Sequence, residues 1–246
     1  MVYDKNFWDN KWTKSPIVYG GRTLRNPNDK LVIDVRNFIT WNDSLLDQVV
    51  KTYSLKRQNI NSTALAVQKF VVKFLTYKYD EEANQCPEFW QFPFETLQSQ
   101  VGDCEDGAIL TASLCIAAGI PNYRIKVAAG EVQEAPTAPT GGHAYCIFLA
   151  DRLETERKMD WTILDWCFFE DSTWPIEKKP LAKDGGYNKS YKDVWFTFNN
   201  EHSWNQTALS IEAGRVSQDG AVVQAINEEQ SYISKMMAEI QAKIDE

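Results

Sequence analysis

Apolar residues recur every three or four positions in two stretches of the first third of the chain, at about 42–53 and 61–77. This spacing places them on one face of an α-helix, so the two stretches predict a helical N-terminal hairpin. Each stretch begins beside residues whose side chains can cap a helix: Asn42 or Asp43 for the first, and Asn61 or Ser62 for the second.

A third helix is expected from about Cys104 to Ala118. Gly119 suits the position after a helix end, and Pro121 prevents the helix from continuing. Beyond it the apolar period falls towards two, which is typical of strands. The expected strands lie at 123–132, 143–149, 161–167 and 191–198, with a further short one at 31–35.

The remaining segments show less regular patterns. Residues 1–30 combine aromatic residues with Gly and Pro and have no period, which predicts an extended N-terminal arm over the core. Residues 80–101 are also interpreted as irregular. Residues 201–246 are expected to form a linker followed, from Gly220, by a long amphipathic helix. That helix either docks on its own domain or serves self-association or a protein partner.

The composition narrows the classes of function. The chain has 246 residues, 43% of them hydrophobic, and a net charge of −8. The negative charge argues against nucleic acid as the main partner, because binding phosphates needs clustered Lys and Arg. No apolar run approaches the roughly 20 residues of a membrane-spanning helix, and the N-terminus lacks the apolar core of a signal peptide. We therefore expect a protein with no signal peptide and no membrane partner, located in the cytoplasm or associated with a virion.

Five cysteines, an odd number spread widely, do not indicate a disulfide framework. The chain has no CxxC and only two histidines, so a zinc site would need an unusual ligand set and no metal is expected. Most cysteines in proteins are inert core residues, and three are interpreted in this way: Cys115, Cys146 and Cys167.

Cys104 differs, because polar residues surround it and the third helix begins there. Free N–H groups and the positive end of the helix dipole favour a thiolate at such a position. Its neighbours Asp103, Glu105 and Asp106 would by themselves raise its pKa, so the helix end and a nearby imidazolium have to outweigh them. Cys104 is the candidate nucleophile.

His143 and Asp165 are the candidate partners of that thiol. His143 opens the strand HAYCIFLA, whereas the other histidine, His202, lies in a polar segment. Asp165 closes the apolar strand WTILD, where a carboxylate is costly unless it is paired. Pairing with the far nitrogen of the His143 ring would fix the tautomer needed to activate the thiol. Alternatively, His143 is a structural hydrogen-bonding residue and Asp165 caps the next turn.

Such chemistry also needs donors for an oxyanion. The backbone N–H of Cys104 is one candidate, and the Gln91 amide and the Trp90 indole are two others. Both of these side chains are equally compatible with packing or loop roles.

On these residues the chain resembles the transglutaminase-like superfamily of papain-like cysteine enzymes, including bacterial and phage-encoded members. The resemblance rests on GDCEDGAILTASLCIAAGIP, GGHAYCIF and WTILDWC in this order, and covers roughly residues 31–200. It implies an α+β fold in which the nucleophile helix packs on an antiparallel sheet carrying histidine and aspartate. It further implies a Cys–His–Asp triad of Cys104, His143 and Asp165 that forms a thioester and needs no dissociable cofactor.

Three functions fit these features. The first is a thiol-dependent amide-bond hydrolase acting on a protein or peptide. The second is a protein transglutaminase or acyl transferase with the same triad. The third is a phage virion-associated structural protein that retains the fold, since a fold alone does not fix a function.

Overall fold

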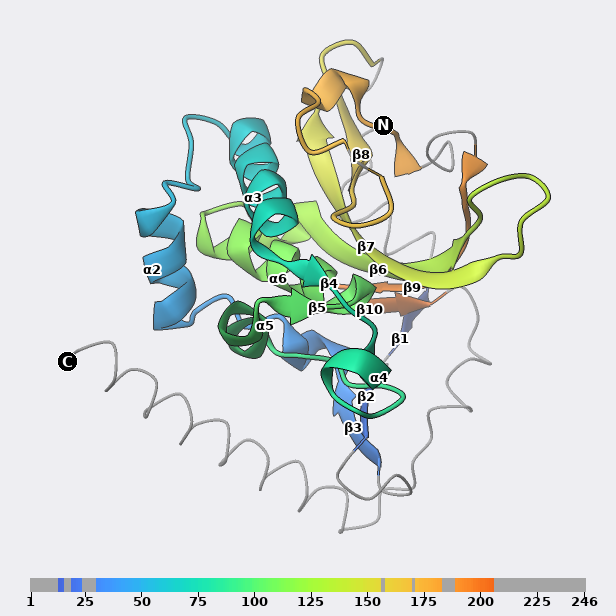
Figure 1. The fold of residues 1–246 in the computed structure, drawn as a ribbon. Helices are drawn as coiled ribbons and strands as arrows, with labels where there is room; N and C mark the ends of the chain where they lie inside the picture. The colour runs from blue at the N-terminus through green and yellow to red at the C-terminus, as the bar shows by residue number, and fades with distance from the viewer. Residues whose placement is uncertain are drawn as a thin grey trace.

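The computed structural model describes residues 13–15, 19–23, 30–155, 158–169, 171–182 and 189–205. The predicted C-terminal helix lies outside the described residues, as does most of the predicted N-terminal arm. The described chain contains α-helices and a large antiparallel sheet, as Figure 1 shows, so the predicted α+β class is confirmed.

Three helices match the predicted ones closely. They are α2 (Ser44–Thr52), α3 (Ile60–Phe74) and α6 (Cys104–Ala117). The Asp43 side chain accepts a hydrogen bond from the N–H of Leu45 and caps α2 as predicted. The cap of α3 is instead Asn59, whose side chain accepts from the N–H of Ser62, so the prediction of Asn61 or Ser62 was wrong.

The segment predicted to be irregular, 80–101, contains two helices, so that prediction was wrong in part. They are α4 (Asp80–Ala83) and α5 (Pro93–Ser99). Pro93 occupies the first position of α5, where its missing N–H has no helical partner to lose. Two short strands beside them pair in parallel, β4 (Thr76–Tyr77) and β5 (Val101–Gly102), and bring the end of α3 to the start of α6.

The main sheet has six strands, all antiparallel to their neighbours, in the order β1-β10-β9-β6-β7-β8. Their bounds are Thr13–Ser15, Ser203–Asn205, Tyr191–Phe198, Ile125–Val132, Gly141–Asp151 and Met159–Leu164, respectively. Strands β9, β6, β7 and β8 are the predicted ones. Strands β1 and β10, at the other end of the sheet from β8, extend it beyond the predicted limits of 31–200.

The smaller elements complete the described chain. A hairpin of β2 (Tyr19–Thr23) and β3 (Lys30–Asp34) lies apart from the main sheet, and β3 corresponds to the short strand predicted at 31–35. Three short 3-10 helices follow β3, precede β6 and follow β8: η1 (Val35–Phe38), η2 (Asn122–Arg124) and η3 (Ile176–Lys178).

The core has two layers, one on each face of the sheet. Helix α6 packs on β6 and β7, and α2, α3 and α5 pack on α6 (Figure 1). Alternate residues of β7 serve the two faces, as the pleat requires. Ala144, Cys146 and Phe148 join the helix-side cluster, whereas Tyr145 and Ile147 join a smaller cluster on the other face.

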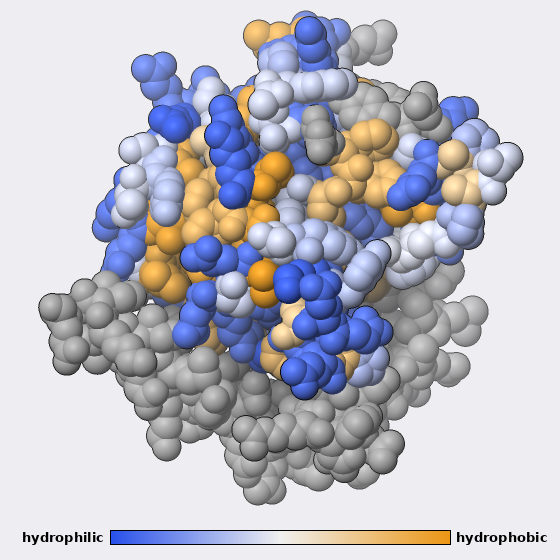
Figure 2. Space-filling view, viewed as in Figure 1, coloured by the Kyte–Doolittle hydropathy of each residue, from blue (hydrophilic) through white to orange (hydrophobic). Residues whose placement is uncertain are grey.

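The surface in Figure 2 shows apolar side chains gathered over α2 and α3 and mainly polar ones over α4. All five cysteines are free, and Cys115 and Cys146 are buried. None of the helices in the described part of the chain has the length and apolarity that a membrane crossing requires.

Candidate active site

A pocket of about 340 Å³ lies between the first turn of α6 and the first residues of β7. Cys104 and His143 both line it, although 39 positions separate them in the sequence. Carboxyl and aromatic side chains form much of the remaining wall, among them Asp80, Glu88 and Trp195. A concave site of this size can take part of a peptide chain.

Cys104 is the first residue of α6, as predicted. The backbone of Ala144, the residue after His143, lies close enough to the Cys104 thiol to lower its pKa. The Cys104 carbonyl accepts a hydrogen bond of 3.1 Å from the Trp166 indole, which follows Asp165. Both contacts fasten the nucleophile to the segments that carry the other two candidate residues.

Gly107 explains how Trp166 reaches the helix. A Cβ at this position would lie 2.3 Å from the Trp166 ring, so only glycine lets the indole lie against α6. Glycine inside a helix lowers its stability by roughly 1 kcal/mol relative to alanine. A glycine at an unfavourable helical position in the GDCEDG segment therefore indicates a close contact there, which was not among the predictions from the sequence.

The Cys104 thiol is largely buried, and its pKa lies well above the usual value. Burial is the main cause, and the charges of Glu105 and Asp103 add to it. The Cys104 sulfur lies 3.2 Å from Glu105 Oε2, to which it donates. In this arrangement burial and the neighbouring acids favour the neutral thiol.

The carboxyl groups around the tip of α6 form what we call the acidic cluster: Asp80, Asp103, Glu105 and Asp106. Burial raises the pKa of all four, and charged neighbours within the cluster raise the pKa of Asp103, Glu105 and Asp106 further. The pKa of Asp103 rises to about 6. Oxygens of Asp80, Asp103 and Asp106 lie within 4.8 Å of one another, an all-oxygen set that could hold a hard divalent cation.

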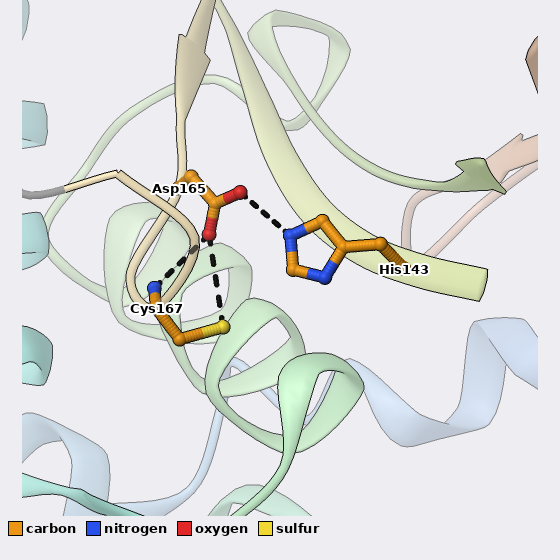
Figure 3. A group of neighbouring side chains, drawn as sticks. All are labelled: His143, Asp165 and Cys167. Carbon is orange, nitrogen blue, oxygen red and sulfur yellow. Dashed lines mark hydrogen bonds and ion pairs between the residues drawn. The ribbon is translucent and has the colours of Figure 1, made fainter. Parts of the chain in front are cut away.

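His143 and Asp165 lie side by side, as Figure 3 shows. His143 Nε2 is 2.6 Å from Asp165 Oδ2, and the ring's other nitrogen points away from the carboxylate. Asp165 follows β8 directly, and both side chains are buried. A carboxylate that accepts from Nε2–H leaves Nδ1 of a neutral imidazole free to accept a proton.

The Asp165 carboxylate is fully buried, yet its pKa is lowered. Burial favours the neutral acid, but the His143 imidazole and several hydrogen bonds outweigh it. The N–H groups of Cys167 and Phe168 donate to Oδ1 at 3.0 and 3.3 Å, and the Tyr191 hydroxyl donates to Oδ2 at 2.7 Å. We call Asp165 with these donors and His143 the Asp165 cluster.

A buried glutamine on α3 holds the main chain at this point. The Gln68 amide donates to the Asp165 carbonyl at 2.6 Å and to Asp171 Oδ1 at 2.8 Å. The buried Lys179 ammonium donates to the same Asp171 oxygen at 2.8 Å. Gln68 and Tyr191 were missed in the sequence, because each occupies a position where an apolar residue would fit the pattern equally well.

The two predicted oxyanion donors are engaged elsewhere. The Gln91 amide donates to Asp106 Oδ2 at 2.6 Å and to the Val101 carbonyl at 3.1 Å, so it fastens the acidic cluster and is not free to serve a substrate. Trp90 lines the pocket, but its indole donates to Glu88 Oε1. The backbone N–H of Cys104 remains the candidate at the helix end.

Comparison with known families agrees with this geometry. Residues 47–148 match the family model described as "Transglutaminase-like domain", a stretch that runs from α2 into β7 and includes Cys104 and His143. Over these residues the chain is similar to the transglutaminase-like family. The predicted resemblance to this superfamily is thereby confirmed, whereas the link to phage-encoded members stays a prediction, and no curated protein matches the chain.

Solved structures similar to this chain include LapG of Legionella pneumophila. It is 19% identical, covers 70% of this chain and 91% of LapG, and has a TM-score of 0.46. A structure titled as a putative cysteine protease from Cytophaga hutchinsonii is 18% identical, covers 57% of this chain and 42% of that one, and has a TM-score of 0.36. A structure titled "TGase" is 15% identical, covers 60% and 35%, and has a TM-score of 0.37.

Proposed function

We propose that the protein is a thiol-dependent amide-bond hydrolase that acts on a protein or peptide through Cys104, His143 and Asp165. The observation that carries this proposal is the His143–Asp165 contact of 2.6 Å at a pocket that Cys104 also lines. A paired imidazole beside a cysteine at a helix N-terminus is the arrangement of an activated nucleophile. The transglutaminase-like domain supports the same class of chemistry.

The proposed reaction begins from a neutral thiol, because burial and the acidic cluster raise the pKa of Cys104. Nδ1 of His143 takes the thiol proton as the sulfur attacks the substrate carbonyl. The resulting oxyanion collapses to a thioester, and the imidazolium returns the proton to the departing amine. Water then attacks the thioester with His143 as base, which releases a carboxylic acid and restores the thiol.

Asp165 has two parts in this scheme. Its carboxylate holds the Nε2–H tautomer of His143, so that Nδ1 is the basic nitrogen. It also stabilises the imidazolium that forms after proton transfer. Its lowered pKa means that it remains charged at neutral pH and can do both.

The test is a digest of a peptide library of random sequence, read by mass spectrometry as new amino termini. Wild-type protein is expected to create new termini that Cys104→Ala and His143→Ala do not. Cys115→Ala is the matched control, because that thiol is buried in the same helix away from the pocket. Cleavage by Cys104→Ala at the wild-type rate would refute the proposal.

The same thioester could be resolved by an amine, which would make the protein a transferase. The match of residues 47–148 to a transglutaminase-like family supports this second candidate function. Incorporation of a fluorescent primary amine into a glutamine-containing protein, dependent on Cys104, would favour it over hydrolysis. The role in a phage particle stays a prediction from the sequence.

A further inference from the structure

Tyr191 on β9 is the one side-chain hydroxyl that the described residues place on the Asp165 carboxylate. It is 4% exposed, and its hydroxyl donates to Asp165 Oδ2 at 2.7 Å. His143 Nε2 contacts the same oxygen at 2.6 Å. One carboxylate oxygen therefore serves both the imidazole and the phenol.

From this shared oxygen we infer that Tyr191 is a positioning residue of the proposed reaction, one that sets the orientation and basicity of His143 through Asp165. The inference rests on the proposed function, in which His143 is the base. Tyr191 does not line the pocket, so it acts through Asp165 and not on a substrate.

The surrounding packing gives Tyr191 little freedom to do anything else. Its ring packs edge-on against Tyr145 at 4.6 Å and against Phe168 at 5.6 Å between centroids. Phe168 in turn contacts the His143 ring at 5.4 Å, and its N–H holds the other Asp165 oxygen. Rotation of the carboxylate would break contacts on both of its oxygens at once.

The electrostatic consequence follows from the number of donors. A donor spreads the charge of Asp165 and so weakens its pull on the imidazole proton. Removing the phenol hydroxyl leaves the charge concentrated on Oδ2, which stabilises the protonated imidazole. The base would then be protonated over a wider range of pH and available to the thiol over a narrower one.

Other ionisable groups also face this cluster. They are Cys104 and Glu105 from α6, Tyr145 from β7, Cys167 and Asp171 from the segment after β8, and Lys179, which pairs with Asp171. Of these, Tyr145 offers the matched control. It belongs to the same aromatic cluster and contacts the His143 ring at 5.8 Å, but it makes no hydrogen bond to Asp165 among the described contacts.

The experiment is the pH titration of the His143 imidazole by NMR. The chain has only two histidines, so a His202→Gln variant assigns both signals. In Tyr191→Phe the midpoint is expected to move up by about half to one pH unit. In Tyr145→Phe the His143 midpoint is expected to move by less than a quarter of that shift.

A second readout is the alkylation rate of Cys104 by iodoacetamide, measured against pH. Tyr191→Phe is expected to slow the alkylation about three- to tenfold near pH 6 and to leave the rate near the wild-type value at pH 8.5. A loss of packing would instead slow the alkylation equally at every pH. An unchanged His143 midpoint in Tyr191→Phe, or the same shift in Tyr145→Phe, would overturn the inference.

If Tyr191→Phe does not fold, 3-fluorotyrosine at position 191 replaces it. Fluorine makes the phenol a stronger donor, so the His143 midpoint is expected to fall, and a rise or no change would overturn the inference. The proposed function fails by a different result, namely a Cys104 alkylation rate that does not depend on His143.

Discussion

The acidic cluster and Asp165 lie on either side of the Cys104–His143 pair, and their pKa values are shifted in opposite directions although burial raises the pKa of both. In the acidic cluster, Glu105 and Asp106 lie among other acids, and their pKa values are raised well above normal. In the Asp165 cluster a carboxyl that is at least as buried has a lowered pKa. The difference lies in the neighbours: like charges in the first, and an imidazole, a phenol and two N–H groups in the second.

The comparison shows that the neighbouring groups of a buried carboxyl, and not the extent of its burial, decide whether it stays charged. It also assigns different parts to the two clusters in the proposed reaction. The Asp165 cluster keeps a fixed negative charge beside the base. The acidic cluster holds the thiol neutral until His143 takes its proton.

The largest effect is expected from Asp165→Asn. Both oxygens of the Asp165 carboxylate accept hydrogen bonds. In the asparagine variant an NH2 group replaces one of these oxygens, so the groups that donate to that oxygen would face another donor. The unfolding free energy at pH 7 is expected to fall by about 2–4 kcal/mol, as for a buried donor left unsatisfied near a charge. Urea denaturation measures this, and a loss below about 1 kcal/mol would contradict the assignment of Asp165 as the charged centre.

Gly107→Ala tests the contact that joins the two clusters. Alanine should strengthen an isolated helix by roughly 1 kcal/mol, but its Cβ would lie 2.3 Å from the Trp166 ring. We expect the unfolding free energy to fall by about 1–3 kcal/mol, as is typical of overpacking, and the alkylation of Cys104 to become slower. Thermal unfolding and alkylation check both parts. A gain in stability would show that Trp166 does not lie against α6.

Asp103→Asn tests the acidic cluster through the pH dependence of stability. The pKa of Asp103 is raised to about 6 in the fold from an ordinary 3.8, so its protonated form stabilises the fold below pH 4. That contribution is lost as pH rises from about 4 to 6. Relative to Asp103→Asn, the wild type should lose on the order of 2 kcal/mol between pH 4 and pH 7. Parallel stability curves for the two proteins would contradict this.

Glu105→Gln should have the smallest effect on stability and still change the thiol. A glutamine resembles the protonated acid that the raised pKa favours, so the unfolding free energy at pH 7 should change by less than about 1 kcal/mol. At pH values where Glu105 is ionised, removing its charge should lower the pKa of Cys104 and speed its alkylation. Glu81→Gln, an exposed acid at the rim of the pocket, is the control.

Much of this arrangement could be predicted from the sequence. The start of α6 at Cys104, the span of β9 and the positions of His143 and Asp165 near strand ends all follow from local periodicity and turn residues. The helices α4 and α5 could not be found in this way, because they are short and lie among Pro, Gln and aromatic residues.

The supporting contacts were out of reach for a different reason. Trp166 contacts Cys104, which lies 62 residues away in the sequence, and Gln68 contacts Asp165, which lies 97 residues away. A buried Tyr191 in a strand resembles any core aromatic until the fold brings its hydroxyl to Asp165 across the width of β6 and β7. The raised pKa of Cys104 depends mainly on its burial, which only the fold sets, whereas the contributions of its neighbours Asp103 and Glu105 could be predicted from the sequence.

The decisive measurement is the iodoacetamide alkylation rate of Cys104 relative to Cys86 in one sample, in wild type and in His143→Ala. Cys86 is a more exposed thiol and serves as the internal reference. If His143 is the base for Cys104, His143→Ala should slow Cys104 at least tenfold at pH 7 and leave Cys86 unchanged. Equal Cys104 rates in the two proteins would contradict the proposed coupling between thiol and imidazole.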